Sequence, residues 1–398
     1  MMKQKFHSEL IQSGNWSSEL SLAASRILAE LEQTPDLTCL FISPHFQDDA
    51  EAIVAQLDEE LSSVHTIGCT GESIVGVKTE VESAPAISVW SAVLPGTSIT
   101  PIRLTFERTI GGGAIHGWPE EALESWGDES TLLLLGEPFS FPTDVLLAEL
   151  NEKQPGKPVI GGMASGFFSP GENRVFLNRD VFSIGAVGVL LQGAIRVESV
   201  VSQGCRPIGE PLVITKCERN VIQQLRGEPA LKHVHDIYES SSTHEQAAMQ
   251  QGLNLGRVID EYKDDFEQGD FLVRNIENVV PDEGSIVVTD FVRAGQTVQF
   301  HLRDAEAADG EMKQLLAKKR DSTTAQPTAG LLFTCNGRGS RMFETSHHDA
   351  TVINDVIGEV PLAGFFAMGE IGPIGGTNFV HGFTASVALF FDPTESQQ

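Results

Sequence analysis

Apolar residues recur at helical spacing twice near the start of the chain, on either side of a short apolar run. Residues 17–33 and 50–61 each place apolar side chains about every 3.6 residues, which predicts two amphipathic helices. The apolar run at 37–43 is closed by Pro44 and predicts a buried strand between them. Residues 86–94 alternate around Val89 and Trp90 and predict a further strand. The opening of the chain therefore has the pattern of a mixed α/β protein.

The same order of strand, helix and glycine-containing segment recurs at three places. The predicted strands lie at 37–43, 132–135 and 331–334, and we interpret the glycine segments as turns. The offset from strand to glycine is 28, 28 and 32 residues, for the pairs Leu40 to Gly68, Leu133 to Gly161 and Leu332 to Gly364. These offsets indicate three copies of one unit. Strand, helix, strand is also a common supersecondary plan, so the pattern alone does not require a duplication.

The segment between the second and third copies has a different pattern. A helix through Val221, Ile222 and Leu225, capped by Gly227, comes first. Short β-like runs follow and predict an antiparallel meander, at 253–259, 271–276, 285–291 and 297–302. Residues 305–320 then form a charged helix.

With 398 residues, the chain is longer than one hydrophobic core usually supports, so we expect two domains. The fold class is mixed α/β, with sheets flanked by helices in each domain and a partly antiparallel meander in the second. We expect an N-terminal helix or extension at 1–34, a first domain at 35–220, a second domain at 221–390 and a tail at 391–398. The boundary fits best near 215–225.

The balance of charges excludes several classes of partner. Fifty-five acidic and 27 basic residues give a net charge of −28, which repels nucleic acids and anionic membranes. Five scattered cysteines without a CxxC spacing are typical of reduced thiols. The N-terminus has no apolar signal region, and no stretch is long enough to cross a membrane. We therefore expect a cytoplasmic protein.

The first candidate site is a glycine-rich loop that directly follows a predicted strand. Its residues, which emerge at the end of a sheet, are Cys335, Asn336, Gly337, Arg338 and Gly339. Arg338 could hold a carboxylate or a phosphate, and Glu370 is a single charge within an apolar, glycine-rich segment. Together they would suit an amino-acid ligand, with Glu370 on the ammonium and Arg338 on the carboxylate. The alternative is that Arg338 pairs with an acidic neighbour, Glu370 included, and binds no ligand.

Cysteine chemistry offers a second candidate. Cys205 lies beside Arg206, a cation that can lower a thiol pKa, although a buried inert cysteine fits equally. Two short clusters could hold a metal, His347-His348-Asp349 and His233-Val234-His235, but neither has a spaced set of companion ligands, so we predict no metal. Motifs for nucleotide, dinucleotide and serine-hydrolase chemistry are absent from the sequence, so we predict no cofactor.

Several separated phrases together resemble the FIST N and FIST C domains. They are Gly-Cys-Thr-Gly-Glu at 68–72, Val-Ser-Gln-Gly-Cys-Arg-Pro-Ile-Gly at 201–209, Cys-Asn-Gly-Arg-Gly at 335–339 and Gly-Glu-Ile-Gly-Pro at 369–373. Further agreement lies at 269–275, at 295–301 and in Asn378 and His381, so that the resemblance covers about residues 35–390. It adds Cys69, Cys205, Arg206 and Asn378 to the candidate ligand-binding residues.

The resemblance implies a sensory module that binds small ligands such as amino acids and acts in signal transduction. Because we see no output domain in the sequence, we expect the signal to pass to an unidentified protein partner. Two other functions stay open, a thiol-dependent enzyme that uses Cys205 or Cys335 and a scaffold that binds no ligand. Without a complete catalytic set, we favour a protein that is not an enzyme.

Overall fold

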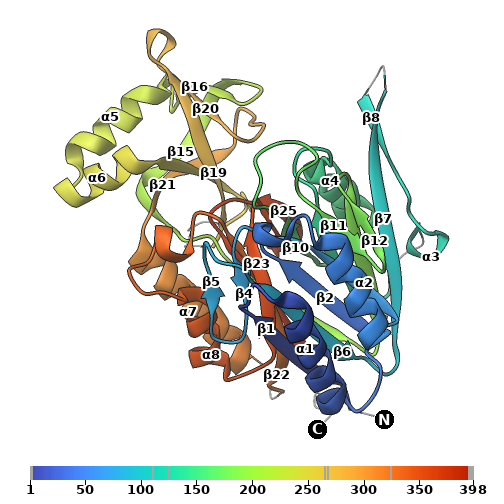
Figure 1. Ribbon diagram of the computed structural model, residues 1–398. Helices are drawn as coiled ribbons and strands as arrows, with labels where there is room; N and C mark the ends of the chain where they lie inside the picture. Colours follow the sequence, from blue (N-terminus) through green and yellow to red (C-terminus); the bar gives the residue numbers. More distant parts are fainter. Residues whose placement is uncertain are drawn as a thin grey trace. The chain divides into compact units, whose positions relative to one another are not determined.

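The computed structural model describes residues 3–109, 112–123, 126–263, 266, 269–322 and 325–392. The chain divides into two compact units, a larger one of Met1–Val201 with Lys313–Gln398 and a smaller one of Ser202–Met312 (Figure 1). The mixed α/β class is confirmed. The division differs from the single boundary expected near 215–225, because the smaller unit is inserted into the larger one. Of the expected tail, Phe391 ends a strand and residues 393–398 lie outside the described residues.

The larger unit consists of three consecutive copies of one plan, an outer strand, a helix, a strand, a helix, a parallel strand, a hairpin and a last strand. The first copy comprises β1 (Lys5–Ile11), α1 (Trp16–Leu31), β2 (Leu37–Ile42), η1 (Pro44–Phe46), α2 (Ala50–Leu61), β3 (His65–Thr70), β4 (Ile74–Val75), β5 (Glu80–Val81) and β6 (Ile87–Val93). Its expected helices and strands are thus confirmed.

The second copy keeps the plan and adds one strand. It comprises β7 (Thr97–Thr109), β8 (Gly112–His116), α3 (Glu120–Leu123), β9 (Ser130–Gly136), α4 (Thr143–Lys153), β10 (Val159–Met163), β11 (Val175–Leu177), β12 (Asp180–Phe182) and β13 (Ala186–Gly193). The helix that corresponds to α1 is here the single turn of α3.

The third copy is interrupted after its first strand by the smaller unit. It comprises β14 (Arg196–Ser202), α7 (Ala305–Asp321), β22 (Pro327–Cys335), η3 (Gly339–Arg341), α8 (His348–Ile357), β23 (Leu362–Ala367), β24 (Glu370–Ile374), β25 (Thr377–His381) and β26 (Ala385–Phe391). The recurrence that the sequence indicated is therefore present in the fold.

Each copy gives its hairpin to the sheet of another copy. The three sheets run β1-β6-β2-β3-β11-β12, β8-β7-β13-β9-β10-β24-β25 and β14-β26-β22-β23-β4-β5. The first copy thus gives β4–β5 to the third, the second gives β11–β12 to the first, and the third gives β24–β25 to the second. This cyclic exchange ties the copies together, so no copy completes its sheet alone.

One glycine position recurs in the three parallel strand pairs. The registers place each glycine opposite a leucine of the preceding strand, in the pairs Gly68 with Leu40, Gly161 with Leu134, and Gly364 with Leu332. A Cβ atom added to these glycines would lie 2.1, 1.8 and 1.8 Å from the carbonyl oxygen of the paired leucine. Only glycine fits such an approach. The glycine segments are therefore strands β3, β10 and β23, and our prediction of turns there was wrong.

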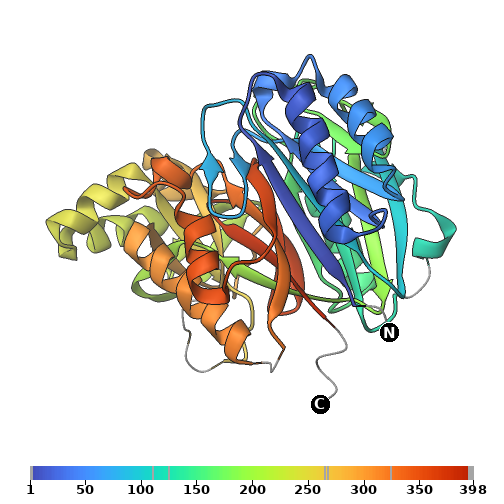
Figure 2. The ribbon, with the colours of Figure 1, turned by 60° about the horizontal axis from the view of Figure 1, so that its bottom comes forward.

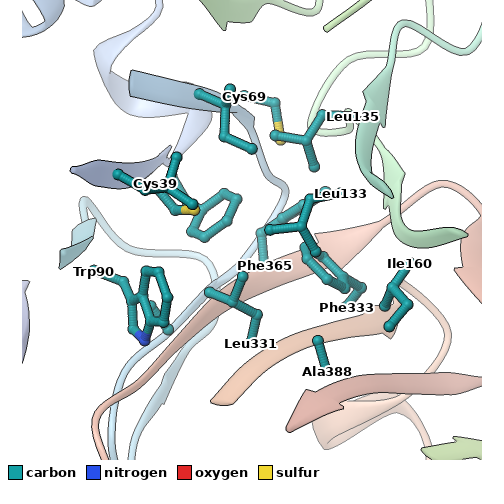
Figure 3. Packing of buried hydrophobic residues seen from close by; sticks show 14 of the residues in the cluster. Cys39, Cys69, Trp90, Leu133, Leu135, Ile160, Leu331, Phe333, Phe365 and Ala388 are labelled. Atoms are coloured by element: carbon teal, nitrogen blue, oxygen red, sulfur yellow. The ribbon is translucent and has the colours of Figure 1, made fainter. Parts of the chain in front are cut away.

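The three sheets turn equivalent faces toward one central core (Figure 3). Side chains at three equivalent positions meet there, from the sets Cys39, Leu133 and Leu331; Phe41, Leu135 and Phe333; and Trp90, Val189 and Ala388. In the last set, the large Trp90 is matched by two smaller side chains, which keeps the core filled at native density. The core therefore depends on all three copies at once.

The helices cover the outer faces of the sheets. In the first copy, α1 and α2 lie over β2 and β6, with Leu20, Ile27, Ile53 and Leu57 buried against them. In the third copy, α7 and α8 cover the corresponding face (Figure 2). Arg320 of α7 donates to the carbonyl of Val356 in α8 at 3.0 Å. The central strands β2 and β22 are thus buried on both faces, as their continuous apolar sequences require.

The smaller unit is an antiparallel sheet with two helices. Its elements are β15 (Cys205–Glu218), β16 (Val221–Leu225), β17 (Glu228–Pro229), α5 (Ala230–Ser240), α6 (Thr243–Gln251), β18 (Leu253–Val258), β19 (Phe271–Val280), η2 (Pro281–Glu283), β20 (Ser285–Val288) and β21 (Thr297–Arg303). The expected meander is confirmed. The expected helix through Val221 and Leu225 is wrong, because these residues form β16, which pairs with β15 and β20.

Candidate functional site

The glycine-rich loop lies at the carboxyl end of β22, as the sequence predicted. The Asn336 amide donates to the Ala367 carbonyl at 3.1 Å, and the Gly337 amide donates to the Cys335 Sγ at 3.4 Å. Gly339 has a φ of +58°, and a Cβ there would come within 2.6 Å of the Phe366 ring. The loop therefore depends on its glycines for both its conformation and its packing.

Arg338 is fully buried and forms an ion pair with Asp349 in the first turn of α8. Its Nε and Nη2 donate to the two carboxylate oxygens at 2.8 and 2.7 Å, and Thr334 Oγ1 donates to Asp349 Oδ2 at 2.6 Å. Burial acts to raise the pKa of Asp349, but the Arg338 charge and these hydrogen bonds hold it well below its usual range. Asp349 thus occupies the two guanidinium nitrogens with which Arg338 would hold a ligand carboxylate. The sequence had suggested Glu370 as a possible partner of Arg338 in this role.

Glu80 reaches the same ion pair from the hairpin β4–β5. Its side chain is 2% exposed, and Oε1 accepts a hydrogen bond from the Ala350 amide at 2.9 Å. Burial, and next the charge of Asp349, raise the pKa of Glu80 to about 8. At neutral pH, Glu80 is therefore mostly protonated, which limits the negative charge beside Asp349.

Glu370 lies beside Cys335 at the start of β24. It is fully buried, and Oε2 accepts from the Thr384 amide at 3.1 Å, while the Cys335 amide donates to the Thr384 carbonyl at 3.0 Å. Burial raises the pKa of Glu370 well above its usual value, against smaller opposing effects of Thr384, Arg338 and the Cys335 thiol. Burial, and next the Glu370 charge, raise the pKa of Cys335 to about 12. We call Arg338, Asp349, Glu80, Glu370 and Cys335 the charged cluster.

A more exposed group of polar residues adjoins the loop. The Arg341 guanidinium is 58% exposed, forms an ion pair with Glu72 and donates to the Asn336 carbonyl at 2.6 Å. The Ser340 amide donates to Glu82 at 3.0 Å. These residues link the buried loop to solvent, and we call Glu72, Glu82, Asn336, Ser340 and Arg341 the rim.

Several buried oxygen atoms of the cluster and the rim have no hydrogen-bond partner among the described residues. They are Oε1 of Glu370, Oε2 of Glu80, Oε2 of Glu72 and Oδ1 of Asn336. Leaving a buried polar atom without a hydrogen-bond partner costs about 1–3 kcal/mol, so each such atom favours a bound partner. In a native structure, such an atom calls for a bound partner or a functional role.

The structure places the other predicted residues elsewhere. Cys69 is buried in the central core (Figure 3), where burial raises its thiol pKa. Asn378 on β25 holds the start of β10, because its Oδ1 accepts from the Val159 amide at 2.8 Å. In the smaller unit, Cys205 is buried, and Arg206 pairs with Asp304 and Glu245, both at 3.1 Å.

Sequence reasoning missed Asp349, Glu80 and Glu72. We considered Asp349 only as a metal ligand together with His347 and His348, and an acidic residue in the first turn of a helix was the signal available. Glu80 joins the cluster only through the hairpin exchange, for which the sequence has no local signal. Within the described ranges, no group of three or more His, Cys, Asp or Glu side chains could hold a metal ion.

Comparison with known proteins identifies the family. The FIST N domain matches residues 36–228, and the FIST C domain matches residues 230–373. The chain belongs to the FIST family. It is similar to a Mycobacterium tuberculosis protein, with 43% identity over 359 residues, which are 90% of this chain and 92% of that protein. A Mycobacterium bovis protein is 39% identical over 363 residues, 91% of this chain and 92% of its own length. Both are named only as uncharacterised proteins.

The FIST family adds a general functional setting. FIST domains are associated with sensory and signal-transduction proteins. The two family matches do not coincide with the compact units, since β4–β5 of the FIST N match completes the sheet of β22 and β23 in the FIST C match. No helix in the described part of the FIST chain is both long and apolar enough to cross a membrane.

Proposed function

We propose that this FIST protein is a cytoplasmic sensory protein that binds a small ligand, an amino acid, at the charged cluster and the rim. The single observation that carries the proposal is Glu370, a fully buried carboxyl group with an oxygen that has no partner among the described residues. A ligand ammonium would supply both the missing donor and the positive charge that an ionised buried carboxylate needs.

The position of the cluster supports a sensory role. Its members come from β5, the loop after β22, α8 and β24. A ligand bound there would contact the exchanged hairpins β4–β5 and β24–β25 and the helix α8 at the same time. A ligand shifts the equilibrium between two conformations of a protein only if it contacts them differently. A ligand that hydrogen-bonds to Glu80 or Glu370 would favour the conformation in which these residues are held in the cluster. The signal would then pass to a protein partner through the surface.

A scaffold that binds no ligand is the second candidate, and one observation favours it. The Arg338–Asp349 pair is closed from solvent, with side chains 0% and 1% exposed, as in a structural ion pair. The thiol-enzyme alternative has less support, because a nucleophilic cysteine needs a lowered pKa and that of Cys335 is raised to about 12.

Thermal-shift measurements with the twenty amino acids test the proposal. A ligand at a hundredfold excess over its Kd should add about 2.7 kcal/mol to the free energy of unfolding. Loss of the shift in Glu370→Gln, with retention in the surface variant Glu359→Gln, would support the cluster as the site. If no amino acid shifts the wild-type melting temperature, the scaffold function is preferred.

A further inference from the structure

Three buried oxygen atoms around the loop have no hydrogen-bond partner among the described residues. Asn336 Oδ1 lies on the loop, Glu72 Oε2 belongs to the residue paired with Arg341, and both are hydrogen-bond acceptors. Glu370 Oε1 becomes a third acceptor when its carboxyl group is ionised. A ligand that completes this set must donate hydrogen bonds. A primary ammonium carries three N–H donors and a positive charge, which suits three acceptors that include two carboxylates.

The cations of the site are already engaged by acids. The Nε and Nη2 of Arg338 donate to both oxygens of Asp349. Arg341 forms its ion pair with Glu72. A ligand carboxylate that approached these guanidinium groups would have to displace a protein carboxylate, so its binding would gain little.

We propose that the site recognises the ammonium group of a primary amine and does not require a carboxylate on the ligand. This inference rests on the proposed function and extends its ligand class from amino acids to primary amines in general. It differs from the amino-acid expectation drawn from the sequence, in which Arg338 held the ligand carboxylate. Because burial raises the pKa of Glu370, an ammonium that binds the ionised carboxylate would favour release of a proton from the site.

Matched sets of three compounds test the ammonium group and the carboxylate of an amino acid separately. Each set holds the amino acid, the amine without its carboxylate and the acid without its amine, as in phenylalanine, phenethylamine and hydrocinnamate, or leucine, isoamylamine and isocaproate. Calorimetric titration of the full chain should give amine Kd values within about tenfold of the amino acid, and no binding of the acid. The binding heat should vary with the ionisation enthalpy of the buffer, since a proton is released.

Three variants test which residues bind the ammonium group. Glu370→Gln should weaken amine binding about tenfold to hundredfold, the range of one hydrogen bond to a charged group. Glu72→Gln, a change at the partly exposed rim, should weaken it as well and guards against a folding defect in the buried variant. Glu137→Gln is the matched control, because Glu137 is buried at the end of β9 in the second copy and also has an oxygen without a partner. It should leave the affinity unchanged.

Each outcome bears on a different claim. Binding of amino acids or of the carboxylic acids without binding of the amines would overturn the inference and leave the proposed function standing. Amine binding that survives both Glu370→Gln and Glu72→Gln would overturn the inference too, as would a loss of binding in Glu137→Gln alone. If no compound of any set binds, the proposed function and the inference both fail.

Discussion

Removing Asp349 should strongly destabilise the larger unit. Asp349→Ala leaves the Arg338 guanidinium buried, with its bidentate partner gone and the hydrogen bond of Thr334 lost. Both side chains of the pair are at most 1% exposed, so solvent cannot replace the carboxylate without opening the structure. Breaking a buried pair in this way costs about 3–5 kcal/mol. The double variant Arg338→Met, Asp349→Leu removes both charges and should be more stable than Asp349→Ala.

Urea denaturation followed by tryptophan fluorescence measures this loss. The four tryptophans all lie in the larger unit, and they are Trp16, Trp90, Trp118 and Trp126. The signal therefore reports the unit that holds the cluster, whatever the smaller unit does. A loss below about 1 kcal/mol for Asp349→Ala, or a double variant less stable than the single one, would refute the assignment of a buried, mutually dependent pair.

Three further predictions follow from single contacts. Gly364→Ala should prevent folding of the larger unit or lower its melting temperature sharply, because the added Cβ would lie 1.8 Å from the Leu332 carbonyl oxygen; near wild-type melting would contradict the strand register. Cys335 should resist iodoacetamide at neutral pH in the folded protein and react after unfolding, since its pKa is raised to about 12; fast labelling of the native chain would revive a thiol enzyme. Because the pKa of Glu80 is about 8 when folded and near 4.5 when unfolded, the folded state binds more protons between these values, and stability should fall as pH rises from about 4.5 to about 8. Glu80→Gln should make that decline shallower, and an unchanged pH profile would argue against a protonated Glu80.

Much of the larger unit could be predicted from the sequence, because its elements are strongly periodic. The helices α1 and α2 and the strand β2 emerged close to their observed bounds. The glycine segments were misread because a glycine in a buried strand is locally indistinguishable from a glycine in a turn. The requirement at Gly364 comes from the carbonyl of Leu332 on the neighbouring strand, and the sequence contains no local trace of it. In the smaller unit, the sequence pattern predicts a helix through Val221 and Leu225. That prediction is wrong because pairing with β15 and β20 overrides the local pattern.

The candidate site was predictable only in part. The loop at 335–339 and Glu370 stood out because charges within glycine-rich, apolar segments are unusual. The partner of Arg338 could not be predicted, since Asp349 follows it by eleven residues and meets it only through the fold of α8 against β22. Glu80 could not be predicted either, because it lies on the β4–β5 hairpin, which the first copy contributes to the sheet of the third. Cys69 and Asn378 were chosen by resemblance, and their contacts in the structure are packing and strand-joining contacts.

A crystal structure of the full chain soaked with the tightest-binding amine tests the central claim most directly. We expect the ligand nitrogen at about 2.9 Å from Oε1 of Glu370, with Arg338 still paired to Asp349. Density for the amine elsewhere, or a ligand carboxylate on Arg338 in place of Asp349, would contradict it.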